Sequence, residues 1–179
     1  MRLPVWIVKL WRVLPPLMLL FTISSVQSSN SIVDKAKAGF IHNFTKYTHW
    51  SDIQVNRNLL ICTLNKEPLS GYLEALNGRQ VQSRVIRVRL SEKSDQWSDC
   101  DVLYITSSEV KNLEEVLNNV RQFPVLTISD APGFVHAGGI IGLKLRASRI
   151  RFDINQGAAD SAGLKLSSQL LKLADQVLP

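Results

Sequence analysis

The chain lacks most of the motifs that identify enzymes and metal proteins. Neither G-x-G-x-x-G nor GK[ST] occurs, and no serine lies in a G-x-S-x-G elbow. His42 and His49 lie seven residues apart on a predicted helix, about 10 Å of rise, which is too far for one metal ion. Cys62 and Cys100 have no metal-ligand spacing either. We therefore expect no catalytic residues, no metal and no cofactor.

A strong charge of one sign is also missing. The net charge is +6, but three of the 21 basic residues, Arg2, Lys9 and Arg12, lie in the first twelve positions. Without them, 18 basic residues stand against 15 acidic ones. An excess of three is too small for a dedicated nucleic-acid-binding domain, so we expect no nucleic-acid partner.

The N-terminus has the pattern of an export signal. Its basic residues precede the apolar stretch 13–26, and small and polar residues follow. The stretch is shorter than the ~20 apolar residues of a spanning helix, and Pro15-Pro16 interrupts it. We predict a signal peptide over residues 1–28, cleaved near Ser28, with an uncleaved anchor as the alternative. Residues 29–179 then form one domain in the periplasm.

Apolar periodicity predicts a mixed fold. Helices are expected over 31–50 (with Ser31 as N-cap), 68–78, 109–120 and 161–178, and strands over 58–65, 84–90, 101–106 and 124–129. Residues 138–145 and 149–155 indicate a hairpin. In the first predicted helix, the apolar face consists of Val33, Ala36, Phe40, Phe44 and Tyr47. We expect a single-domain α/β sandwich: a mostly parallel sheet flanked by helices, with an antiparallel hairpin edge near the C-terminal end.

The segment SDAPGFVHAGGIIGL, residues 129–143, is the main candidate for a small-molecule site. It begins where a predicted strand ends, and ligands of open α/β sheets favour that edge. The alternative is that the segment has a structural role only, as a turn formed by Asp130, Pro132 and the glycines. The candidate ligand or partner residues are Ser129, Asp130, Phe134, His136, Gly138 and Gly139.

Basic side chains occupy the non-core positions of three predicted strands. They are Arg87, Arg89, Lys144, Arg146, Arg149 and Arg151. Brought together, they would form a basic sheet face that suits an acidic partner or anionic head groups; the alternative is an ordinary solvated strand face. The edge of the predicted hairpin also offers backbone groups for pairing, which favours a homodimer.

The two cysteines both lie in the predicted exported part. An even number of cysteines in an oxidising compartment favours a disulfide between Cys62 and Cys100. The alternative is a pair of buried thiols.

Six segments together resemble the YfiR-like family of exported proteins: KAGFIHNFTKYTHW (37–50), LLICTLNKEPLSGYL (59–73), CDVLYI (100–105), VLTISDAPGFVHAGGIIGL (125–143), IRFDIN (150–155) and GLKLSSQLLKLA (163–174). The resemblance covers nearly all of residues 29–179. It implies a periplasmic, non-enzymatic repressor that binds the periplasmic domain of an inner-membrane diguanylate cyclase. It also supports the Cys62–Cys100 bridge, whereas a second cysteine pair that some relatives have near 129–143 is missing here.

Overall fold

The computed structural model describes residues 26–51, 57–64, 66–90 and 94–179. Most of the predicted signal peptide lies outside these residues. Within the described part of the chain, no helix is both long and apolar enough to cross a membrane. The elements are α1 (Val26–Tyr47), β1 (Thr48–Trp50), β2 (Leu59–Thr63), α2 (Pro68–Glu74), β3 (Gln80–Val81), β4 (Arg84–Leu90), η1 (Ser94–Asp99), β5 (Val102–Ile105), η2 (Ser107–Asn112), α3 (Leu113–Val120), β6 (Leu126–Ser129), β7 (Ile141–Arg146), β8 (Arg149–Asn155), α4 (Gln156–Ser161), β9 (Leu164–Leu166), α5 (Ser168–Leu173) and β10 (Gln176–Leu178).

The main sheet has eight strands in the order β10-β8-β7-β6-β5-β2-β4-β3. The pairs from β4 through β2, β5 and β6 to β7 are all parallel, and β7 and β8 form the antiparallel hairpin. The predicted α/β class, mostly parallel sheet and hairpin are therefore confirmed. The hairpin is not the last edge, however, because β10 adds to β8 as a short parallel strand.

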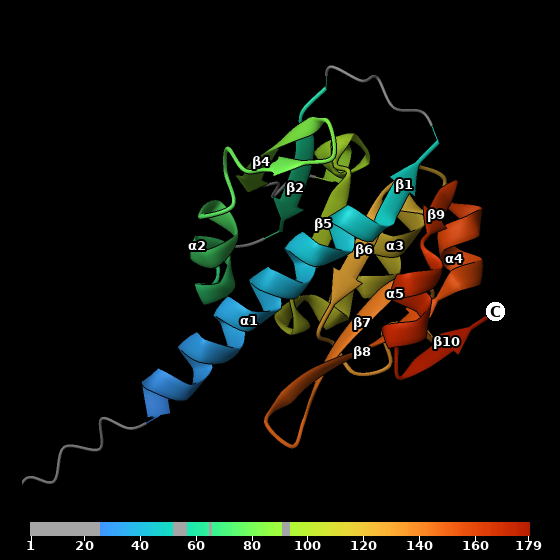
Figure 1. The fold of residues 1–179 in the computed structure, drawn as a ribbon. Coiled ribbons are helices and arrows are strands. Elements are labelled where there is room, and N and C mark those ends of the chain that lie inside the picture. The colour runs from blue at the N-terminus through green and yellow to red at the C-terminus, as the bar shows by residue number, and fades with distance from the viewer. Residues whose placement is uncertain (1–25, 52–56, 65, 91–93) are drawn as a thin grey trace, which may run out of the picture.

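Side chains alternate between two apolar layers, one on each face of the sheet. In β5, Val102 and Tyr104 face a cluster that also contains Ile41 and Phe44 of α1. Leu103 and Ile105 face the opposite cluster, which includes the apolar side of α3. Figure 1 shows α1 crossing in front of the sheet, α2 at the left beside it, and α3 behind the sheet. This alternation makes the sheet the middle layer of a three-layer sandwich.

The first helix differs from its prediction at both ends. It begins at Val26, before the predicted cap Ser31, and it ends at Tyr47, after which the chain enters β1. Serine and asparagine lower helix propensity only modestly, so the polar residues before Ser31 do not stop the helix. Its buried face overlaps the predicted one, because Phe44 is buried and Phe40 and Tyr47 pack against the core, but it is shifted. Ala36 is exposed, while Ala38, Ile41, Phe44 and Thr45 are buried.

The prediction of one helix over 161–178 is wrong, because this range contains β9, α5 and β10 after the end of α4. Gly163 adopts a φ of +71°, which ends α4 and allows a short strand, β9, to pair with β1. Ser167 then caps α5 by accepting a hydrogen bond from the Leu170 backbone N–H. Ala174 is extended, and the chain finishes as β10 against β8. Tertiary pairing decides these short elements, and helical periodicity does not reveal it.

The β7–β8 hairpin closes through a two-residue turn. Ala147 and Ser148 have φ values of 45° and 60°. Such tight hairpin turns favour asparagine and glycine because both central residues need a positive φ. The tip of the hairpin is therefore locally strained, and Figure 1 shows it projecting from the body of the sheet.

Candidate functional site

A cleft of about 810 Å³ lies at the carboxyl edge of the sheet. The chain leaves β2 for β4 on one side and then returns to β5 on the other side, so the strand order reverses between β2 and β5. Crevices beyond the carboxyl ends of strands at such switch points are the usual ligand sites of open α/β sheets. The polar residues that line this cleft are Asn30, Ser31, Asp34, Lys37, Glu67, Tyr72, Tyr104, Asp130 and Lys144.

One wall of the cleft is organised around Asp130, which directly follows β6. The Lys37 ammonium group lies 2.5 Å from Asp130 Oδ2 and 3.7 Å from Asp34 Oδ1. The Ser107 backbone N–H donates to Asp130 Oδ1 at 3.1 Å. The lysine and carboxylate side chains are only 17% and 19% exposed, so their pairing links α1 to the end of β6.

Tyr104 forms the polar floor beside this pair. Burial raises the pKa of its phenol far above the usual value, and the negative charge of Asp130 and a hydrogen bond with Asp130 raise it further. The phenol is therefore neutral across the physiological range. A neutral phenol beside a carboxylate acts as a hydrogen-bond donor.

The facing wall begins at Glu67, the residue before α2. Ser108 Oγ lies 2.5 Å from Glu67 Oε1, and Thr106 Oγ1 lies 2.6 Å from Ser108 Oγ. A reciprocal capping box with Ser70 fixes Glu67 at the start of the helix. The cleft is thus lined by three carboxylates, two lysines and two tyrosines. This arrangement suits recognition of a ligand with an amino group.

The structure separates the residues predicted as a site within 129–143. Ser129 is buried, and its Oγ accepts from the Ala131 backbone N–H at 3.0 Å. Asp130 faces the cleft, whereas Phe134 packs on the opposite face of the sheet. His136 is exposed. Only Asp130 of this set contributes a side chain to the cleft.

The two candidate glycines serve the turn in different ways. Gly138 has a φ of +98°, which other residues rarely adopt. A Cβ at Gly139 would lie 2.2 Å from the Phe134 ring, so Gly139 lets that ring fill the core. Gly138 also lines a separate notch of about 300 Å³ between α3 and α4. The segment is mainly a structural turn, and its start borders the cleft.

The disulfide predicted between Cys62 and Cys100 is present, with a Cα–Cα distance of 6.0 Å. It joins the buried face of β2 to the residue before Asp101. Arg89 lies over it: its guanidinium donates to the Gln96 carbonyl at 2.9 Å and lies 3.8 Å from Cys100 Sγ. Arg89 is therefore engaged locally and covers the bridge.

The predicted basic residues divide into two groups. Arg87 and Arg89 lie on β4, and three strands separate them from the hairpin that carries the other four. In the hairpin, Lys144 pairs with Arg151 and Arg146 with Arg149, so these four side chains share one face. Lys144 contacts Asp153 at 2.5 Å and Asp175 at 3.3 Å, which offsets part of the charge. The six residues do not form one continuous face.

Sequence reasoning missed a buried ion cluster at the other edge of the sheet. Asp101 is 1% exposed and accepts from Arg84, Arg57 and the Leu60 backbone N–H. Arg84 also donates to the carbonyls of Arg57 and Asn58. Arg84 is the first residue of a strand in which apolar and polar residues otherwise alternate, and the sequence gives no sign that its side chain is buried. The cluster ties β2, β4 and β5 together and is structural.

The metal prediction stays a prediction, although no group of three histidine, cysteine, aspartate or glutamate side chains in the described ranges is arranged to hold an ion. His42 is partly buried on α1, and burial and the charges of Lys46 and Arg79 lower its pKa. His49 is exposed on β1.

These features define the structural class of the protein. It is an α/β sandwich with an open mixed sheet, one internal disulfide and a polar cleft where the strand order reverses. Comparison of sequences then places the chain in the YfiR/HmsC-like family, whose profile matches residues 34–175. The chain belongs to that family, as its resemblance predicted.

Two solved structures have a similar fold. A conserved domain protein from Vibrio cholerae O1 biovar El Tor is 13% identical, with a TM-score of 0.54 over 80% of this chain. The ABC domain from Streptococcus pneumoniae, solved in complex with L-Trp, is 11% identical, with a TM-score of 0.53 over 81% of this chain. This chain covers 60% of each of those chains. At these identities the likeness concerns the fold alone.

Proposed function

We propose that this protein is an exported regulator that binds the periplasmic domain of an inner-membrane diguanylate cyclase and holds it inactive. The observation that carries the proposal is family membership over residues 34–175. YfiR-like proteins are periplasmic and are generally non-enzymatic regulators. The Cys62–Cys100 bridge is consistent with an oxidising compartment.

Repression of this kind needs differential affinity. The protein must bind the inactive state of the cyclase more tightly than the active state, because only that difference shifts the population.

Cellular cyclic-di-GMP tests the proposal. The nucleotide is measured in wild-type and deletion strains, and in deletion strains that express either the wild-type chain or Cys62→Ser/Cys100→Ser, with protein levels checked by immunoblot. Deletion should raise the cyclic-di-GMP concentration, and expression of the wild-type chain should return it to the level of the wild-type strain. Unchanged cyclic-di-GMP on deletion contradicts the proposal. Failure of the double variant at normal protein level would link repression to the bridge.

A second function, a periplasmic small-molecule sensor, is favoured by the cleft beside Asp130. Its acidic groups and neutral phenol suit an amine, and a similar fold was solved with L-Trp, so amino acids including L-Trp are the first probes. A ligand of the folded state raises the melting temperature as its concentration rises. Asp130→Asn should abolish that rise, whereas His136→Ala, at an exposed position outside the cleft, should keep it. No shift with any amino acid counts against this sensor function.

A further inference from the structure

The β8 strand has an outer edge that β10 covers only in part. β10 pairs with Asp153, Ile154 and Asn155, and no other described strand pairs with the outer side of Arg149–Phe152. The Asp175 backbone N–H donates to the Phe152 carbonyl at 2.9 Å, so Phe152 directs its carbonyl away from β7. Backbone groups alternate along a strand, and Ile150 therefore also directs its N–H and C=O outward. The free edge is centred on Ile150.

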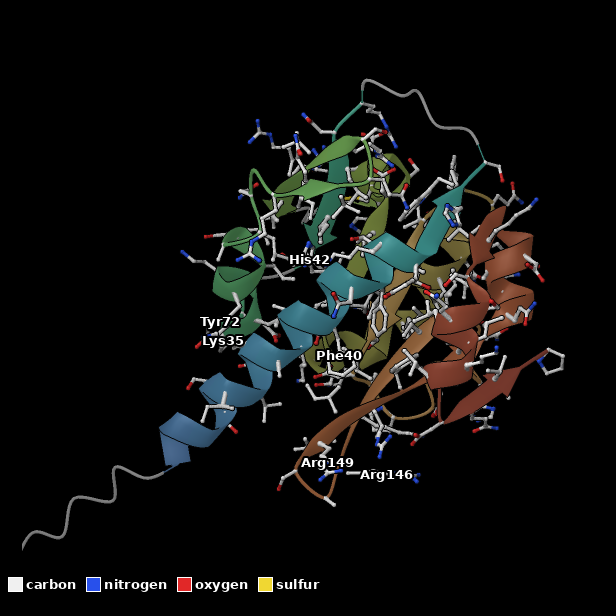
Figure 2. The ribbon with its side chains drawn as sticks, in the orientation of Figure 1. Lys35, Phe40, His42, Tyr72, Arg146 and Arg149 are labelled. Atoms are coloured by element: carbon white, nitrogen blue, oxygen red, sulfur yellow. A yellow bond between two sulfur atoms is a disulfide. The ribbon has the colours of Figure 1, made fainter. Side chains whose placement is uncertain are left out.

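The two faces beside this edge differ in chemistry. Arg146, Arg149 and Arg151 are exposed on one face, and Figure 2 shows Arg146 and Arg149 at the hairpin tip. Among the described residues, no carboxylate lies within ion-pair distance of Arg146 or Arg149, and Arg151 has only Asp175, at 3.9 Å. The other face carries Leu145, which is 55% exposed, opposite Ile150. A strand added here would meet arginine on one side and aliphatic groups on the other.

We propose that the edge at Arg149–Phe152 binds an extended segment of a partner protein in which acidic and apolar residues alternate. The segment adds a strand beside β8, pairs with the outward groups of Ile150, and places its carboxylates against Arg149 and Arg151. Its apolar side chains pack against Ile150. This inference rests on the proposed function, because it assigns the segment to the periplasmic domain of the cyclase.

Charge selects this occupant over two others. A second copy of the chain at the same edge would bring its own Arg149 and Arg151 against these, and like charges on adjacent strands repel. An anionic lipid surface would satisfy the arginines but would leave the outward N–H and C=O groups of Ile150 without strand partners. An acidic strand satisfies both the charges and the backbone.

The test uses the exported chain, purified, and a short capped peptide of alternating glutamate and valine. Control probes are the lysine–valine peptide, the glutamate–valine peptide with N-methylated amides, and phosphatidylglycerol vesicles. Binding is followed by fluorescence anisotropy, and hydrogen exchange of the Ile150 amide is followed by NMR. The acidic peptide should slow exchange at Ile150 by about tenfold or more, while the lysine and N-methylated peptides should not.

Two variants locate the contact. Arg149→Glu/Arg151→Glu should weaken peptide binding by about tenfold or more, because each exchange replaces attraction with repulsion. Arg87→Glu, at an exposed position on distant β4, should change it by less than about twofold. Circular dichroism establishes that both variants are folded.

Three results overturn the proposal: equal binding of the lysine peptide, unchanged exchange at Ile150, or binding of vesicles without binding of the peptide. Protection of Ile150 that grows with protein concentration alone would identify a second copy instead. Peptide binding does not depend on the cellular experiment. If the peptide binds while deletion leaves cyclic-di-GMP unchanged, the binding edge at β8 is supported. Only the assignment of the bound segment to the cyclase is then wrong.

Discussion

The two ends of the main sheet are stabilised in different ways. At the β4–β2–β5 end, the Cys62–Cys100 bridge lies on one side and the buried Asp101 cluster joins three strands. At the β7–β8–β10 end, the ion pairs of Lys144 with Asp153 and Asp175 are partly exposed, and the hairpin projects through a strained turn. The first end is cross-linked by a disulfide and a buried ion cluster, whereas the described ion pairs of the second end are partly exposed.

This difference indicates where each role lies. Segments that bind partners come from the less stable parts of a fold, because they must adjust on binding. A β-edge that accepts another strand also has to stay free in the unbound protein. In the proposal above, the cross-linked end provides the stability and the hairpin end provides the edge that binds the partner.

The largest effect is expected from Asp101→Ala. The change leaves the Arg84 guanidinium, whose side chain is 3% exposed, without its carboxylate. Breaking a buried pair in this way costs about 3–5 kcal/mol of unfolding free energy. Urea denaturation measures it. The control, Asp99→Ala, removes a carboxylate that is 65% exposed and should cost less than about 0.5 kcal/mol. A loss below about 1 kcal/mol for Asp101→Ala would remove the contrast between the two ends.

Removal of the bridge should come next. Cys62→Ser/Cys100→Ser opens a loop with a sequence separation of 38, for which chain entropy predicts a loss of up to about 4 kcal/mol. Denaturation of the variant and of the reduced wild-type chain measures the loss twice. Hydrogen exchange should accelerate most in β2 and β5. Faster exchange confined to the hairpin would contradict the assignment of the bridge to the stable end.

Gly139→Ala tests the turn that connects the two ends. The new Cβ would overlap the Phe134 ring, and the repacking should lower the unfolding free energy by about 1–3 kcal/mol. Gly71→Ala is the matched control. Gly71 is an exposed helical position with nothing within 4 Å of a new Cβ, so alanine should stabilise the protein by about 0.5–1 kcal/mol. Equal effects of the two changes would show that Phe134 shifts without cost.

Sequence patterns predicted the fold where elements are long or strongly apolar. Strands β2, β4, β5 and β6 and the hairpin lie within or close to their expected ranges, because buried runs and period-two alternation are local signals. The short elements after Gly163 were missed, since β9 and β10 depend on partners more than 100 residues and about 20 residues earlier in the chain, respectively.

The candidate site was predicted only at Asp130. The edge rule for open α/β sheets points to a residue that directly follows a strand, and Asp130 is one. Lys37 and Tyr104 reach the same cleft from a helix and from inside a strand, and neither position has a local pattern of its own. The positions of residues in the sequence do not reveal the order of strands in the sheet. The predicted basic face therefore combined Arg87 and Arg89 with a hairpin from which three strands separate them.

The smallest expected effect on stability comes from replacing residues that have a positive φ, and it compares the two ends of the sheet most closely. Ser148→Gly relieves strain at the hairpin tip, where φ is 60°, and should slow local opening of the tip several-fold, for a gain of about 1 kcal/mol. Hydrogen exchange at Leu145 and Ile150 measures it. The midpoint of global unfolding should hardly move if the tip opens separately from the cross-linked end.

The matched position at the other end is Gln82, whose φ is 53° in the turn between β3 and β4. There the side chain donates to the Lys46 and Thr48 carbonyls, so Gln82→Gly exchanges relieved strain for two lost hydrogen bonds and should give no net gain. If Ser148→Gly instead raised the global midpoint and protected β2 and β5 as well, the hairpin would unfold together with the cross-linked end. The edge at Ile150 would then be part of one cooperative unit, and a partner strand would bind a rigid template.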